Sequence, residues 1–363
     1  MLLRGSFRNF VFYDVGEAFD LDKLRDLLGS RGATTQPAFP RRTPEYVRFE
    51  EPAIVEASEP VTLGSGAHVS CSVEYYAYAI VVVQLESAFE GDWDALLTQA
   101  SRWMDSPEVE PHAREVVRRH LQRVAAAVIK PREDWLREDY LVVQLREIQG
   151  DGNLALSAEE LLSAHGQQIA QLIRGELTPL APTTTQQILE ANISYYPSDL
   201  LVAGSSVALV YDRSDEAAAT IQILEYAKIQ LLEFRYYDNF MTRVLTGVYN
   251  TLDQKRNILF SRWSLPRDAN RFNTIRLDVM ELTERIDNAI KFVSDAFYAR
   301  VYRLAASRVG VPEYRDLVEK KLDTARELYD SMVDQFHEAR SFVLEVAVAI
   351  LALLDVLLLL RGK

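Results

Sequence analysis

The sequence predicts an α+β fold, in which an N-terminal mixed α/β domain is followed by long antiparallel helices that form a bundle or coiled coil and end in an apolar helix. Two observations support this class. Short β-branched strands alternate irregularly with helices over residues 1–213, and long uninterrupted helical patterns follow. With 363 residues, 48% of them hydrophobic, the chain is long enough for one large domain or two ordinary ones.

Strand and helix signals mix in the N-terminal part. Residues 10–13 and 79–83 are aromatic and β-branched runs that are typical of strands. Asp20 can cap an amphipathic helix over residues 21–28, and Ser157 with Glu160 has the spacing of a capping box. The other expected elements are helices over 93–103 and 110–129, a strand over 140–145 and a β-hairpin over 200–211.

Three long helices are expected after Asp212, separated at Pro266 and at Gly310 with Pro312. Short turns between long helices favour antiparallel neighbours. The predicted organisation is an α+β domain over 1–213, a long-helix bundle or coiled coil over 214–341, and a transmembrane or oligomer-core helix over 342–361.

The last helix carries an uninterrupted heptad seam. Apolar residues alternate in steps of four and three from Val318 to Leu360, which is typical of a coiled coil. Residues 342–360 are almost wholly apolar and would span about 28 Å as a helix, enough for the hydrocarbon core of a bilayer. Glu345 and Asp355 lie off the seam and would be costly in lipid, so the core of a soluble oligomer is the alternative.

Composition and motifs exclude several classes. A formal net charge of -13 argues against direct binding of nucleic acid. Cys71, the single cysteine, reads as a packing residue, and no secretion signal is apparent. The histidines have no zinc-site spacing, and no phosphate-binding glycine motif or nucleophile elbow is present, so we expect no metal, no cofactor and no catalytic residues.

Two segments combine polar and apolar residues in an unusual way. The helix over 225–238 is apolar on several faces yet contains polar residues that predict either a structural network or a ligand site. A second helix carries aromatic and arginine residues suited either to bundle packing or to contact with a partner. The candidate residues are Glu225, Gln230, Arg235 and Asp238 for the first segment, and Tyr298, Tyr302 and Arg303 for the second.

These segments, together with residues 13–17 and 208–212, resemble the "required for meiotic nuclear division" family, a domain of unknown function related to a mitochondrial translation factor. The resemblance extends to the closing order of a Phe/Tyr helix, a charged helix and an apolar helix. It implies a membrane-associated tether and supplies no active site. Without an N-terminal targeting extension, the chain would be a bacterial member.

The resulting hypothesis is a non-enzymatic, membrane-anchored, homo-oligomeric scaffold of unknown protein partner. It would lie at the cytoplasmic face of the bacterial inner membrane, with a cytoplasmic protein as the alternative. A second hypothesis is a membrane channel component that resembles CorA-type magnesium channels, although the Gly-Met-Asn filter is absent. The third is an enzyme with its site near Glu225, Arg235 and Asp238, for which no nucleophile with a base is evident.

Overall fold

The computed structural model describes residues 1–34, 53–62, 68–149, 156–212, 217–254, 277 and 296–328. The chain divides into two compact units. Unit 1 comprises Met1–Tyr236 and Arg285–Tyr314, and unit 2 comprises Tyr237–Glu284 and Arg315–Lys363.

A nine-stranded sheet is the centre of unit 1. Its strand order is β3-β4-β5-β6-β1-β8-β11-β10-β9, and every neighbouring pair is antiparallel except β8 and β11. Strands β2 and β7 form a separate pair. The mixed α/β character of the N-terminal part is therefore confirmed. The strands are β1 (Leu2–Asp14), β2 (Ala18–Phe19), β3 (Gly32–Thr34), β4 (Ile54–Thr62), β5 (His68–Tyr76), β6 (Ile80–Gly91), β7 (Val128–Ile129), β8 (Leu136–Gln149), β9 (Asn192–Ile193), β10 (Leu200–Ala203) and β11 (Val207–Tyr211).

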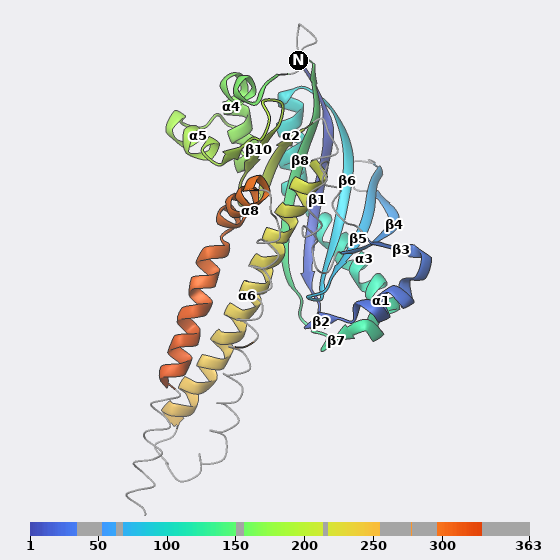
Figure 1. The fold of residues 1–363 in the computed structure, drawn as a ribbon, viewed down its shortest axis with the longest axis vertical. Coiled ribbons are helices and arrows are strands. Elements are labelled where there is room, and N and C mark those ends of the chain that lie inside the picture. The colour runs from blue at the N-terminus through green and yellow to red at the C-terminus, as the bar shows by residue number, and fades with distance from the viewer. Residues whose placement is uncertain are drawn as a thin grey trace, which may run out of the picture. The chain divides into compact units, whose positions relative to one another are not determined.

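Helices cover both faces of this sheet. Helices α1 to α4 contribute side chains to a large apolar core on one face, and α5 packs on α4. The first half of α6 lies across the other face, where its side chains contact β5 and β8 (Figure 1). The helices are α1 (Leu21–Leu28), α2 (Trp93–Met104), α3 (Val109–Val124), α4 (Ala158–Arg174), α5 (Pro182–Leu189), α6 (Ala217–Gln254) and α8 (Ala296–Val309).

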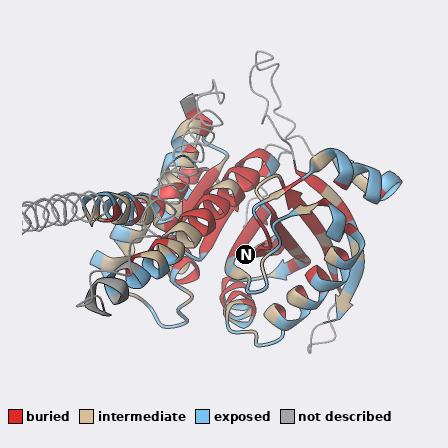
Figure 2. Ribbon diagram, turned by 90° about the horizontal axis from the view of Figure 1, so that it is seen from below, coloured by how far each residue is buried: buried red, intermediate tan, exposed pale blue. Residues whose placement is uncertain are grey.

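Because helices cover both faces of the sheet, the central strands bury side chains on both sides. Phe7 and Val11 of β1 join the core under α1 to α4, whereas the alternating Phe10 and Phe12 are fully buried on the opposite face. Buried positions dominate the sheet and the helix faces turned toward it (Figure 2). A strand buried on both faces reads as a continuous apolar run rather than an alternating one. This explains why residues 10–13 already predict a strand.

Local capping chemistry fixes several of the predicted helix starts. Asp20 accepts a hydrogen bond from the backbone N–H of Lys23 at 3.1 Å. Ser157 and Glu160 form a complete capping box, with reciprocal bonds of 3.2 and 2.8 Å. The expected hairpin is present as β10 and β11. The strand expected over 10–13 is longer, because β1 is paired on both sides along its whole length.

The described part of unit 2 is helical. It contains residues 237–254 of α6 and residues 315–328, and Lys321 joins the two segments by contacts to Asp238 at 2.5 Å and to Thr242 at 2.6 Å. A bundle or coiled coil is not confirmed by these residues. Most of the predicted heptad seam lies outside the described residues.

The prediction of membrane anchoring needs correction. None of the helices in the described ranges is both long and apolar enough to cross a membrane. The 38-residue α6 is long enough, but charged side chains such as Lys228, Glu233 and Arg235 interrupt its apolar character. The expected membrane helix at 342–361, with Glu345 and Asp355, lies outside the described residues.

The pairing of β1 with β8 shifts register between Arg4 and Gly5, and the close approach of the strands there gives a test of the sheet packing. A Cβ atom at Gly5 would lie 1.9 Å from the backbone oxygen of Gln144, so Gly5→Ala must displace β8. We expect a loss of about 3 kcal/mol in the free energy of unfolding. The matched control is Gly247→Ala in α6, where a Cβ would meet no atom within 4 Å and better helix propensity should stabilise the helix by about 1 kcal/mol. Thermal unfolding followed by circular dichroism measures both, and an unchanged midpoint for Gly5→Ala would contradict the packing.

Candidate functional site

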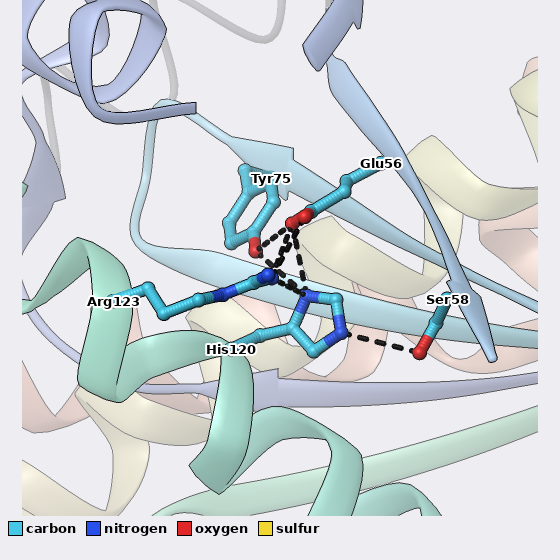
Figure 3. A network of polar contacts seen from close by, with 5 residues as sticks. All are labelled: Glu56, Ser58, Tyr75, His120 and Arg123. Carbon is cyan, nitrogen blue, oxygen red and sulfur yellow. Dashed lines mark hydrogen bonds and ion pairs between the residues drawn. The ribbon is translucent and has the colours of Figure 1, made fainter. Parts of the chain in front are cut away.

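A compact group of polar side chains connects the edge of the sheet to α3. Glu56 and Ser58 are two residues apart on β4, so both side chains point to the same face of the sheet. His120 and Arg123 are three apart on α3, so they share one face of that helix. Tyr75 of β5 completes the group (Figure 3), which we call the β4–α3 site.

The geometry places His120 between an acid and a hydroxyl. The Nε2 atom of His120 lies 3.2 Å from Oγ of Ser58, and its Nδ1 atom lies 3.0 Å from Oε2 of Glu56. The side chains of His120 and Glu56 are only 6% and 4% exposed, whereas Ser58 is half-buried. Solvent therefore reaches the serine end of this chain of contacts and not the acid end.

Glu56 is held by further donors. Arg123 donates from Nη2 to both carboxylate oxygens at 2.8 and 2.7 Å, and the hydroxyl of Tyr75 donates to Oε2 at 3.2 Å. A buried carboxylate needs such donors, because burying it unpaired would cost several kcal/mol. The acid is thereby fixed in position beside the imidazole.

Two tautomers of His120 fit these contacts. With the proton on Nδ1, the ring donates to Glu56, and Nε2 is free to accept from Ser58. With the proton on Nε2, the ring donates to Ser58, and Nδ1 accepts from Arg123, whose Nη2 lies 2.9 Å away. Burial is the main reason that the pKa of His120 is below its usual range, with Glu56 opposing and Arg123 adding to this effect. The ring is therefore neutral near pH 7 in either form.

Cys71 and Arg119 border the serine end of the site. Cys71 is opposite Ser58 in the β4–β5 ladder, and burial raises the pKa of its thiol. The charge of Arg119 acts on both Cys71 and His120, and its guanidinium lies 3.4 Å from Oε2 of Glu59. The half-exposed guanidinium of Arg119 thus acts electrostatically on two residues at the serine end of the site. Across the residues that the structure describes, no group of three or more potential metal ligands lies close enough to hold a metal ion.

The predicted residues on α6 do not form one site. Glu225 bonds to Tyr76 of β5 at 2.8 Å, Gln230 accepts from Tyr302, and Arg235 pairs with Glu138 of β8. These contacts lie at different points along the helix, and they fix it to the sheet and to α8.

Ion pairs and hydrogen bonds compensate the other charged side chains on and near α6. Lys228 also pairs with Glu138, at 2.9 Å, and burial lowers the pKa of this lysine to about 8. Asp238 pairs with Lys321 within unit 2 rather than with Arg235. Tyr298 is buried, and Arg303 donates to the carbonyl of Ala299 one turn earlier at 3.3 Å. Each of these contacts can be explained by the packing of the helices and strands, without a ligand or partner.

Each half of the β4–α3 site has a recognisable spacing in the sequence. Glu56 and Ser58 alternate on one strand, and His120 and Arg123 have the spacing of one helix turn. The pairing of a strand with a helix more than 60 residues away cannot be read from either pattern alone. Only the packing of α3 against the sheet brings the two patterns together.

The family comparison gives a consistent match to the N-terminal part of the chain. A family model described as "Uncharacterized protein MJ0711, N-terminal domain" matches residues 4–218. The uncharacterized protein MJ0711 of Methanocaldococcus jannaschii is 21% identical over 192 residues, which are 53% of this chain and 58% of that relative. The match thus spans less than two thirds of the relative. No solved structure matches significantly.

These matches correct two predictions. The matching family is not the "required for meiotic nuclear division" family, and the relative is archaeal rather than bacterial. Most of the residues that suggested the resemblance lie in or next to β1, β11, α6 and α8, where packing selects aromatic and β-branched residues whatever the family. The membrane-anchored scaffold and the channel alternative both fall, since neither the family nor the described helices support a membrane span.

The role of Glu56 as the acceptor of three donors is testable by its stability effect. Glu56→Gln removes the charge that Arg123, Tyr75 and His120 face, so we expect the free energy of unfolding to fall by about 2 kcal/mol. Glu59→Gln is the matched control on the same strand, because that side chain is 86% exposed and its contact with Arg119 is long. Urea denaturation would contradict the described network if both variants unfolded at the wild-type midpoint.

Proposed function

The chain belongs to the family of the MJ0711 N-terminal domain, and we propose that this domain is a hydrolase of acyl esters that uses Ser58, His120 and Glu56. One observation carries the proposal. The imidazole of His120 bridges Ser58 Oγ and Glu56 Oε2 at 3.2 and 3.0 Å, which is the spacing of a nucleophile, its base and the acid that orients the base.

Each side chain has a defined role in this reaction. Nε2 of His120 takes the proton of the Ser58 hydroxyl while Oγ attacks the ester carbonyl. The same proton then passes to the leaving alcohol as the carbon–oxygen bond breaks. Water attacks the acyl-serine in the second half, with His120 again acting as base, and releases the acid and the free serine. Glu56 stays ionised, orients the ring through Nδ1–H and stabilises the imidazolium that forms transiently.

The surroundings support the same assignment. Burial keeps His120 neutral near pH 7, as a general base must be. Ser58 is accessible at the sheet edge, where an ester can approach it.

We also propose that the long helices of unit 2 pair as a bundle or coiled coil and that copies of the chain associate through them, within the helical region expected over 214–341. Lys321 links residues of the first and third expected helices, and the seam positions Val318 and Ala325 are buried. Buried seam positions favour helix pairing. Any further protein partner would bind beside this association.

Reaction with a serine-directed fluorophosphonate tests the hydrolase. We expect wild-type protein to be labelled on Ser58 and to hydrolyse p-nitrophenyl acetate. Ser58→Ala should lose labelling and at least about 10³-fold in kcat/KM, and Glu56→Gln about 10²- to 10⁴-fold. Because the base must be neutral, the rate should fall as the pH drops through a pKa below the ordinary histidine value of about 6.5.

Ser70→Ala is the matched control for this experiment. Ser70 is an exposed serine on β5 whose hydroxyl bonds to a backbone carbonyl, so labelling and turnover should be unchanged. If wild type and Ser58→Ala react alike, the other histidine tautomer applies, and the β4–α3 site is a structural network.

Helix association is tested by light scattering on the full chain. Leu322→Asp places a charge at a half-buried seam position and should reduce the molar mass to that of a monomer. Lys320→Gln, at an exposed position two residues away, should leave the mass unchanged. A wild-type protein that is already monomeric would disprove the association.

A further inference from the structure

A pair of glutamates joins α6 to the sheet on the face opposite the β4–α3 site. Glu74 belongs to β5 and Glu225 to α6, and they are only 9% and 5% exposed. The hydroxyl of Tyr76 contacts both carboxyl groups, at 3.1 Å for Glu74 and 2.8 Å for Glu225. One hydroxyl group thus brings the two buried carboxyl groups together.

The hydrogen bonds among Glu74, Glu225 and Tyr76 require that one of the two carboxyl groups is protonated. A tyrosine hydroxyl has one hydrogen and can donate to only one of the two carboxyl groups. The other carboxyl group can bond to that hydroxyl only by donating a hydrogen of its own, because an ionised carboxylate only accepts. The arrangement of Glu74, Glu225 and Tyr76 is therefore satisfied when one of the two acids is protonated.

The charged groups around Glu74 and Glu225 are engaged in other ion pairs and do not substitute for that proton. The cation that acts on both carboxyl groups is Arg8 of β1, which is paired with Glu86 of β6 at 3.2 Å. Lys228 of α6 is engaged with Glu138 of β8, and the ring of Tyr226 packs edge-on against Tyr76. Ionising both glutamates would therefore place two negative charges together in a dry interface.

We propose that Glu74 and Glu225 form a proton-dependent latch, which holds the first half of α6 on the sheet while one proton is shared and releases it when that proton is lost. Like charges in a low-dielectric interior repel strongly, so loss of the proton would push the helix from β5. The proposal does not depend on the hydrolase, whose residues lie on the other face of the sheet.

The direction of the pH effect follows from proton linkage. Burial, more than any other cause, raises the pKa of both carboxyl groups, so the folded protein binds more protons than the unfolded chain. The stabilisation is complete below the ordinary glutamate pKa of about 4.3 and is lost as the pH rises toward the raised value. One proton corresponds to an unfolding equilibrium that shifts up to about tenfold per pH unit.

Urea titrations across this pH range test the latch. Wild type should lose stability as the pH rises, with hydrogen exchange within residues 217–236 increasing beyond its intrinsic pH dependence. Glu225→Gln and Glu74→Gln should each abolish most of this slope, since an amide donates permanently and carries no charge. Glu90→Gln, at an exposed glutamate of β6, is the matched control and should keep the wild-type slope.

Infrared spectroscopy tests for the shared proton directly in the wild-type protein, even if the glutamine variants fold poorly. Burial raises the pKa of Glu233 to about 7, so the spectrum is recorded at a pD above that value. A band of a protonated carboxylic acid in the wild-type protein under these conditions supports the shared proton. Absence of the band, or a stability slope that the glutamine variants leave unchanged, overturns the latch.

Discussion

The burial of both faces of the central strands is the constraint on which unit 1 depends. Strands β1, β6 and β8 have an apolar core under α1 to α4 on one side and the first half of α6 on the other. Where a strand is covered on both sides, its side chains cannot stay in water, so a polar group there must find a partner within the fold. The pairing of Glu138 with Lys228 and Arg235 is one result.

The two faces meet this constraint differently. The face under α6 contains several ionisable side chains that bond between strand and helix, which fixes the position of α6. The other face is almost entirely apolar, and its polar residues collect where β4 approaches the edge of the sheet. Ser58 is half-buried there, so this edge combines a fixed acid and base with access from solvent. Chemistry on a small molecule is more compatible with that edge than with the closed interface under α6.

The match to the MJ0711 N-terminal domain covers the sheet and its helices and ends near the start of α6. The β4–α3 site and Glu74 lie within the matched residues, whereas Glu225 and unit 2 lie beyond them. A function at the β4–α3 site would thus be a property of the shared domain. The proposed pH dependence of α6 would instead belong to the part of this chain that lies beyond the match.

The sequence by itself determined the local elements of this protein. Capping residues such as Asp20 and Ser157, the apolar run of β6 and the β10–β11 hairpin depend on neighbours along the chain, and they form as expected. Tertiary structure decided what sequence spacing cannot encode. Arg235 pairs with Glu138 rather than Asp238, and His120 meets Glu56 and Ser58, because packing sets these contacts across more than 60 residues of chain. The physical reason is that helix periodicity defines which residues share a face, while only the packed sheet defines what that face meets.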